Sequence, residues 1–169
     1  MNSSHSLARC AITCFALLLS AVLIEEARGQ FNNTCTSAGA VGNGNNGFST
    51  VGATTDGASH TQCNVSGSSQ IYRDVWALYL ASCTGTLTVD ICDSTFDTRL
   101  AVYAGAGCSG ITPIACIDDN CGTGNLRSRA TLSVTSGQTY RIRIGAFLNS
   151  SVNGQGVGSG TCVISCSGP

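Results

Sequence analysis

Apolar and polar residues alternate with a period of two along most of the chain after residue 29. Leu87, Val89 and Ile91 alternate with polar residues, and the segment 140–144 repeats the pattern with arginines between its apolar residues. This period predicts β-strands that have one buried face and one face toward water. Eight segments of this kind are expected: 48–54, 71–80, 84–91, 98–103, 111–117, 130–134, 140–147 and 161–165.

Turn residues separate these segments, among them Asp56-Gly57 and Ser136-Gly137. After residue 29 we find no stretch of ten residues with helical periodicity. That region also contains neither lysine nor glutamate, which are both good helix formers. The sequence therefore predicts an all-β fold, namely an antiparallel β-sandwich or jelly roll of about eight short strands.

The N-terminal segment has the features of a signal peptide. Arg9 precedes an apolar run that ends at Ile24, and the small residues Ala27 and Gly29 predict cleavage before Gln30. The run is shorter than the about 20 apolar residues of a membrane span. We expect a signal peptide at 1–29, an extended lead-in at 30–47 and a sandwich domain at 48–169. The product would be secreted, with no membrane attachment after cleavage.

Charge excludes some partners. Residues 30–169 carry six arginines and seven aspartates, which gives a net charge of −1 with histidine neutral. Because this region has no basic field, we expect neither nucleic acid nor anionic lipid as a ligand.

Several motifs, taken in order, form a recognisable series. The chain contains Asp74-Val-Trp76, then Phe96-Asp-Thr-Arg-Leu-Ala-Val-Tyr103, Cys116-Ile-Asp-Asp-Asn-Cys121 and Gly137-Gln-Thr-Tyr140. Over residues 33–166 the sequence resembles the bacterial pre-peptidase C-terminal domain in its cysteine-rich secreted form.

The resemblance implies a disulfide-stabilised β-sandwich of jelly-roll type without catalytic activity. Such domains usually accompany exported enzymes, and some relatives bind calcium or extracellular polymers. Two departures weaken the analogy. The 140 residues that follow the predicted signal peptide leave no room for an attached catalytic domain. Ile117 also stands where the family motif commonly has asparagine, which removes one oxygen ligand from a cation site.

A calcium site is the first candidate for chemistry. Calcium takes six to eight oxygen ligands, and loops at one edge of the sandwich could bring together Asp97, Asp118 and Asp119. The competing interpretation is that these aspartates accept backbone N–H bonds and shape turns. Calcium is the one cofactor that the sequence offers.

Catalysis has little support. His60 is the only histidine after residue 29, and no Gly-x-Ser-x-Gly elbow is present. In an extended chain the neighbours Asp118 and Asp119 would point to opposite sides, which makes them poor partners for a two-carboxylate hydrolase. We expect a protein that is not an enzyme and a solvated loop histidine.

Two sets of residues are weaker ligand candidates. Tyr72 and Phe147 lie near loops, whereas Trp76 is expected in the core. If a hairpin through Ser136-Gly137 joined two neighbouring segments, their arginines would form an exposed stripe for an anionic polymer. The alternative is a solvated sheet face. The four arginines are Arg127, Arg129, Arg141 and Arg143.

Nine cysteines follow residue 29, a density typical of disulfides in an oxidising compartment and unfavourable to zinc. Spacing leaves many connectivities open. Loop geometry favours four bridges, and Cys162 remains as a buried thiol, because resembling sequences have an apolar residue there and its parity matches Ile164. The expected pairs are Cys35–Cys63, Cys83–Cys166, Cys92–Cys108 and Cys116–Cys121.

These observations predict a secreted, non-catalytic module with a binding or structural role outside the cell. Its ligand would be an extracellular polymer or glycan. The alternatives are a small secreted hydrolase and an inhibitor or folding partner of a secreted peptidase, the latter suggested by the company that the resembling family keeps.

Overall fold

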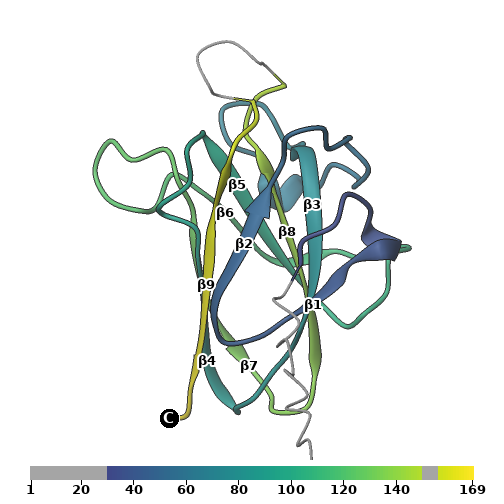
Figure 1. Cartoon of the computed structure of the whole chain (residues 1–169), viewed down its shortest axis with the longest axis vertical. Coiled ribbons are helices and arrows are strands. Elements are labelled where there is room, and N and C mark those ends of the chain that lie inside the picture. Colours follow the sequence, from purple (N-terminus) through teal and green to yellow (C-terminus); the bar gives the residue numbers. More distant parts are fainter. Residues whose placement is uncertain (1–29, 150–155) are drawn as a thin grey trace, which may run out of the picture.

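The structure is a computed structural model that describes residues 30–149 and 156–169, and these residues form a sandwich of two β-sheets (Figure 1). The predicted signal peptide lies outside the described residues. The all-β prediction is confirmed. In addition to the strands, the described residues contain two short 3₁₀ helices, η1 (Cys35–Ser37) and η2 (Thr61–Cys63). The nine strands are β1 (Gly39–Val41), β2 (Gly44–Ser49), β3 (Tyr72–Leu80), β4 (Gly85–Asp90), β5 (Thr98–Ala104), β6 (Pro113–Asp118), β7 (Arg129–Val134), β8 (Thr139–Ala146) and β9 (Ser159–Ser167).

The strands divide into a five-stranded sheet of order β1-β3-β8-β5-β6 and a four-stranded sheet of order β2-β9-β4-β7. Neighbouring strands are antiparallel, except that β1 runs parallel to β3. Figure 1 shows β2 and β9 of the four-stranded sheet side by side. Within the described residues no helix is long and apolar enough to cross a membrane.

All eight predicted strands have counterparts, although β2 begins and ends several residues before the expected 48–54. The ninth strand, β1, has only three residues, which is too short for an alternation to be recognised. The lead-in 30–47 therefore supplies β1 and the first part of β2, so that it contributes an edge strand to each sheet.

The main core lies between the two sheets. Alternate residues of β3, namely Val75, Ala77 and Tyr79, are buried there together with Leu87 and Val89 of β4. Burial of these side chains is the dominant favourable contribution to folding.

A second, smaller core covers the outer face of the five-stranded sheet. Trp76, Ala101 and Tyr103 are buried in it, with Cys63 from η2. β3 is therefore buried on both faces in its middle, which the period-two pattern did not predict. Trp76 is buried as expected, whereas Leu80, which has the same parity in β3, is exposed.

Four disulfides hold the loops over this outer face and at the ends of the strands: Cys35–Cys108, Cys63–Cys116, Cys83–Cys166 and Cys92–Cys121. The expected bridge Cys83–Cys166 is present, and Cys162 is buried and unpaired.

The other three expected pairings, Cys35–Cys63, Cys92–Cys108 and Cys116–Cys121, are wrong. They assumed that cysteines close in sequence pair with each other. Instead Cys116 lies within β6 and contacts the outer core, where it meets Cys63, while Cys121 lies beyond the strand and meets Cys92.

Candidate functional site

Three carboxylates converge where β5 begins and β6 ends. We call Asp97, Asp118 and Asp119 the acidic cluster. One carboxylate oxygen of each residue lies within 4.8 Å of the others. The pairing of Arg99 with Asp118 places the first residues of β5 beside the last residues of β6, which brings Asp97 to the same edge. The three aspartates proposed from the sequence therefore lie together.

The backbone at Asp119 explains how two consecutive carboxylates can meet. Asp119 has φ 51°, in the left-handed region, so the alternation of the strand stops at Asp118. The expectation that neighbouring Asp118 and Asp119 point to opposite sides was therefore wrong. The loop is held by the carbonyl of Arg127, which accepts bonds from the N–H groups of Asn120 (2.9 Å) and Cys121 (3.2 Å).

The cluster contains buried oxygens without hydrogen-bond partners. Asp97 is 8% exposed and the Asp118 side chain 4%. The Oδ1 atom of each has no hydrogen-bond partner within the described residues, whereas Oδ2 of Asp118 accepts a bond from Arg99 at 3.0 Å. Buried polar atoms are nearly always satisfied in native proteins, so we expect a water molecule or an ion beside these two oxygens.

The charges of the acidic cluster also favour a bound cation. Burial, followed by the charges of Asp119 and Asp118, raises the pKa of Asp97 to about 6, while Arg99 and Arg127 act against the rise. Burial also raises the pKa of Asp118, although the hydrogen bond and charge of Arg99 oppose it. Like charges at this spacing repel each other, and a divalent cation among them would offset the repulsion.

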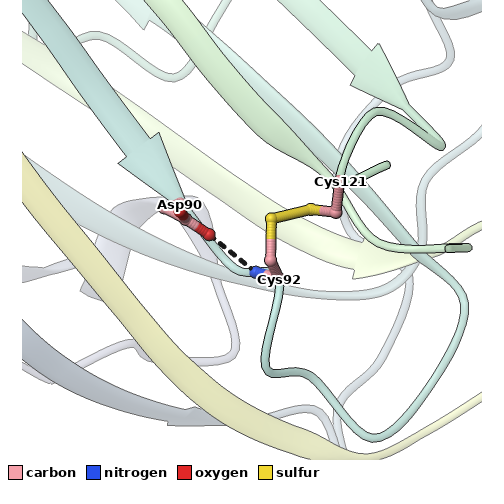
Figure 2. Close-up of side chains that lie close together, drawn as sticks. All are labelled: Asp90, Cys92 and Cys121. Atoms are coloured by element: carbon pink, nitrogen blue, oxygen red, sulfur yellow. Dashed lines mark hydrogen bonds between the residues drawn. A yellow bond between two sulfur atoms is a disulfide. The ribbon is translucent and has the colours of Figure 1, made fainter. Parts of the chain in front are cut away.

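A second group of residues that are of metal-binding types has a structural role (Figure 2). It consists of Asp90, Cys92 and Cys121. The two sulfur atoms form a disulfide, and metal-binding cysteines are thiolates. The N–H of Cys92 donates to Oδ1 of Asp90 at 2.8 Å, and Oδ2 of Asp90 accepts from Arg129 at 2.8 Å. This group ties the end of β4 to the loop that follows the acidic cluster.

The two weaker aromatic candidates make contacts within the protein. Tyr72 is half-buried against the main core. The ring of Phe147 lies under the guanidinium of Arg99, with 4.6 Å from the guanidinium carbon to the ring centroid. Tyr72 is paired with Ala146, the residue before Phe147, so the two candidates lie at the same end of β3 and β8.

The proposed arginine stripe does not exist. β7 and β8 belong to different sheets, so Arg129 and Arg141 cannot share a face. Arg127 donates to the Ser94 carbonyl at 2.8 Å, and Arg141 and Arg143 are buried beneath the loops that cover the five-stranded sheet. Arg141 and Arg143 do lie on one face of β8, as the alternation predicted, but loops cover this outer face of the five-stranded sheet and it is not solvated.

Arg143 organises the loop between β2 and β3. Its Nε donates to Asp74 at 2.9 Å, and its terminal nitrogens donate to the carbonyls of Gly57, Ala58 and Ile71 at 2.8–3.0 Å. Arg141 donates to the carbonyls of Cys35 in η1 and of Ala106 in the loop between β5 and β6. These buried arginines were missed because arginine at alternate strand positions usually faces water.

No family model and no curated protein matches the sequence. Two solved structures show partial similarity to this chain. One is the pre-peptidase C-terminal domain of a collagenase from Bacillus anthracis, with 10% identity, a TM-score of 0.47, and coverage of 76% of this chain and 94% of that chain. The other is the periplasmic inhibitor of g-type lysozyme from Aeromonas hydrophila, with 20% identity, a TM-score of 0.39, and coverage of 54% and 75%. The first is a domain of the family that the sequence resembles.

Proposed function

We propose that the chain is a secreted, non-catalytic β-sandwich module that binds a calcium ion in its acidic cluster. The observation that carries the proposal is the convergence of three carboxylates within 4.8 Å, two of which have a buried oxygen without a partner. A bound cation would satisfy both oxygens and fix the loops that precede β5 and follow β6.

The ligand types favour calcium over transition metals. The acidic cluster offers oxygen only, whereas zinc sites are rich in histidine nitrogen and thiolate sulfur. The carboxylates of Asp97, Asp118 and Asp119 would supply part of the six to eight oxygens that calcium takes, and backbone carbonyls or water would supply the rest. Loop-borne ligands also suit calcium better than magnesium, because magnesium demands near-ideal octahedral geometry.

An extracellular location suits such a site. Four disulfides are typical of an oxidising compartment, and extracellular modules bind calcium with dissociation constants of about 10⁻⁴–10⁻³ M. The ion would stabilise the strand ends, while the partner of the module would be an extracellular polymer, a glycan or a secreted peptidase.

A small hydrolase is the competing function, because the raised pKa of Asp97 would also suit a general acid. The burial of Asp97 argues against it, since a general acid must come within hydrogen-bond reach of its substrate. A hydrolytic activity that is lost in Asp97→Asn would favour the hydrolase.

The test is calorimetric titration of calcium into the oxidised, chelator-treated protein, together with thermal unfolding in calcium and in chelator. Binding to the folded state alone should raise its stability, by about 2.7 kcal/mol when the free ion exceeds the dissociation constant a hundredfold. Asp119→Asn should abolish the heat of binding and the stabilisation.

Asp93→Asn is the matched control. It makes the same chemical change at an exposed aspartate outside the cluster, whose Oδ1 accepts from the Thr161 N–H at 2.9 Å, a bond that the asparagine oxygen can keep. The control should bind calcium as the wild type does. A wild-type protein that gives no heat and no stabilisation with calcium would exclude the site.

A further inference from the structure

A pocket of about 300 Å³ lies over the outer face of the five-stranded sheet, apart from the residues of the acidic cluster. Its lining includes Trp76, Ile111, the Cys35–Cys108 disulfide, Asp56 and His60. The volume is at the lower end of the range for small-molecule sites, about 300–1,000 Å³. We call this space the outer pocket.

The apolar part of the outer pocket is firmly held. Trp76 is 2% exposed, and its ring packs against Tyr103, with 5.7 Å between ring centroids, and under the guanidinium of Arg143. The buried Nε1 of Trp76 has no hydrogen-bond partner within the described residues. Ile111 and the disulfide complete an apolar lining with fixed shape.

The polar part of the outer pocket offers both acceptors and donors. Oδ1 of the exposed Asp56 accepts from the Thr54 hydroxyl at 2.7 Å, and the Asp56 carboxylate has further acceptor capacity. His60 is half-buried against Tyr103, and burial together with the charge of Arg143 lowers the pKa of its imidazole. His60 is therefore neutral at pH 7 and presents one donor nitrogen and one acceptor nitrogen.

Buried charges beneath the outer pocket fix its walls in place. Asp74 accepts from the N–H groups of Asp56 (3.0 Å) and Gly57 (3.2 Å), and Arg143 donates to the carbonyls of Gly57 and Ala58. Because these loop residues are already ordered, a ligand would lose little free energy in arranging them.

We propose that the outer pocket binds a neutral saccharide, either a single ring or the end of a glycan chain. A sugar ring combines an apolar C–H face, which fits Ile111, the disulfide and the small accessible part of Trp76, with hydroxyls that donate to Asp56 and exchange hydrogen bonds with His60. An anionic ligand would be repelled by the Asp56 carboxylate. The proposal does not depend on calcium binding.

The single tryptophan of the chain makes the outer pocket directly observable. The oxidised protein would be titrated with methyl β-glucoside, methyl α-mannoside and N-acetylglucosamine while Trp76 fluorescence is recorded. Benzylamine and glucuronate would serve as cationic and anionic probes. We expect a saturable fluorescence change with at least one neutral sugar, and the same sugar should shift the amide NMR signals of residues 56–60.

Two variants and one control connect this signal to the outer pocket. Asp56→Asn keeps the acceptor for Thr54 but removes the charge, and it should weaken sugar binding about tenfold. Ile111→Phe should weaken binding by filling part of the volume. Asp93→Asn, which lies outside the outer pocket, should bind as the wild type does. Circular dichroism and a thiol count would verify that each variant is folded.

Three results would overturn the proposal. The first is that no neutral sugar changes either the fluorescence or the NMR signals of the folded wild type. The second is that sugar binding occurs but Asp56→Asn and Ile111→Phe bind as tightly as Asp93→Asn. The third is that benzylamine or glucuronate binds more tightly than every neutral sugar, which would assign the outer pocket to charged ligands.

Discussion

Asp74 and Arg143 form an ion pair of 2.9 Å between two side chains that are both fully buried. The pair joins neighbouring strands β3 and β8 and also holds the loop between β2 and β3 through backbone bonds to Asp56 and Gly57. Burial of two charges is costly, and attraction alone seldom repays it. Here the additional hydrogen bonds to loop backbone satisfy the carboxylate and the guanidinium, so the pair orders the loop that lines the outer pocket.

The first prediction concerns the loss of one member of this pair. Asp74→Ala should reduce the free energy of unfolding by about 3–5 kcal/mol, because it leaves the Arg143 charge buried and unpaired. Arg129→Ala is the control, since it breaks the partly exposed pair with Asp90, and such pairs contribute about 0–1 kcal/mol. Urea unfolding measures both, and similar losses in the two variants would contradict this role.

The second prediction is a pH dependence that originates at Asp97. Its folded-state pKa of about 6 lies above the ordinary value of 3.8, so the folded protein binds this proton more tightly than the unfolded chain does. In chelator, the contribution of Asp97 to stability is therefore greatest below about pH 4 and is lost as the pH rises through 6.

The measurement is the free energy of unfolding of the wild type minus that of Asp97→Asn, in chelator from pH 4 to pH 7. This difference should fall as the pH rises, because the asparagine does not titrate. Calcium should bind more weakly below pH 6, where Asp97 takes up its proton. A difference that stays constant over this range would show that Asp97 does not titrate as described.

The sequence predicted the parts of this protein that depend on local pattern. Alternation in β4 and β8 identified both strands, and the turn-rich separators identified their ends. The acidic cluster could also be predicted from the sequence, because Asp97 and Asp118-Asp119 lie at the ends of two predicted strands that follow each other along the chain. What alternation could not reveal is whether the polar face of a strand is solvated, since Arg143 beneath a loop follows the same pattern as Arg129 on an exposed face.

The disulfide map failed for a related reason. Cys63 and Cys116 are far apart in the sequence and meet only because the loop that contains η2 folds over β6. The pairing depends on where a long loop crosses the sheet, and no local pattern encodes that path. Cys83 and Cys166 were predictable because they lie near the ends of strands β4 and β9, which pair directly.

The third prediction links the Cys92–Cys121 bridge to calcium. Cys121 lies two residues after Asp119, and the bridge ties this loop to the end of β4. The double variant Cys92→Ala/Cys121→Ala should bind calcium more weakly, because the loop must then be ordered on binding. Calorimetric titration would compare it with Cys83→Ala/Cys166→Ala, which removes a bridge at other strand ends. Equal affinities in the two double variants would show that the tether does not organise the cluster.

The last prediction concerns Cys162, which is fully buried in the main core beside Ile164 and acts there as a small apolar side chain. Burial, followed by the charges of Asp90 and Asp93, raises the pKa of its thiol well above the ordinary range, so little reactive thiolate exists at neutral pH. Protein that lacks residues 1–29, and with them Cys10 and Cys14, should therefore show no reaction with a thiol reagent while folded. After unfolding in denaturant without reductant it should show one thiol, since eight cysteines are bridged.

Cys162→Ser should lower stability by about 1–3 kcal/mol, because its hydroxyl would need a buried partner, whereas Cys162→Ala should cost chiefly the lost packing. Rapid labelling of the folded protein at Cys162 would contradict its burial, and a mass spectrum with Cys162 in a bridge would contradict the pairing.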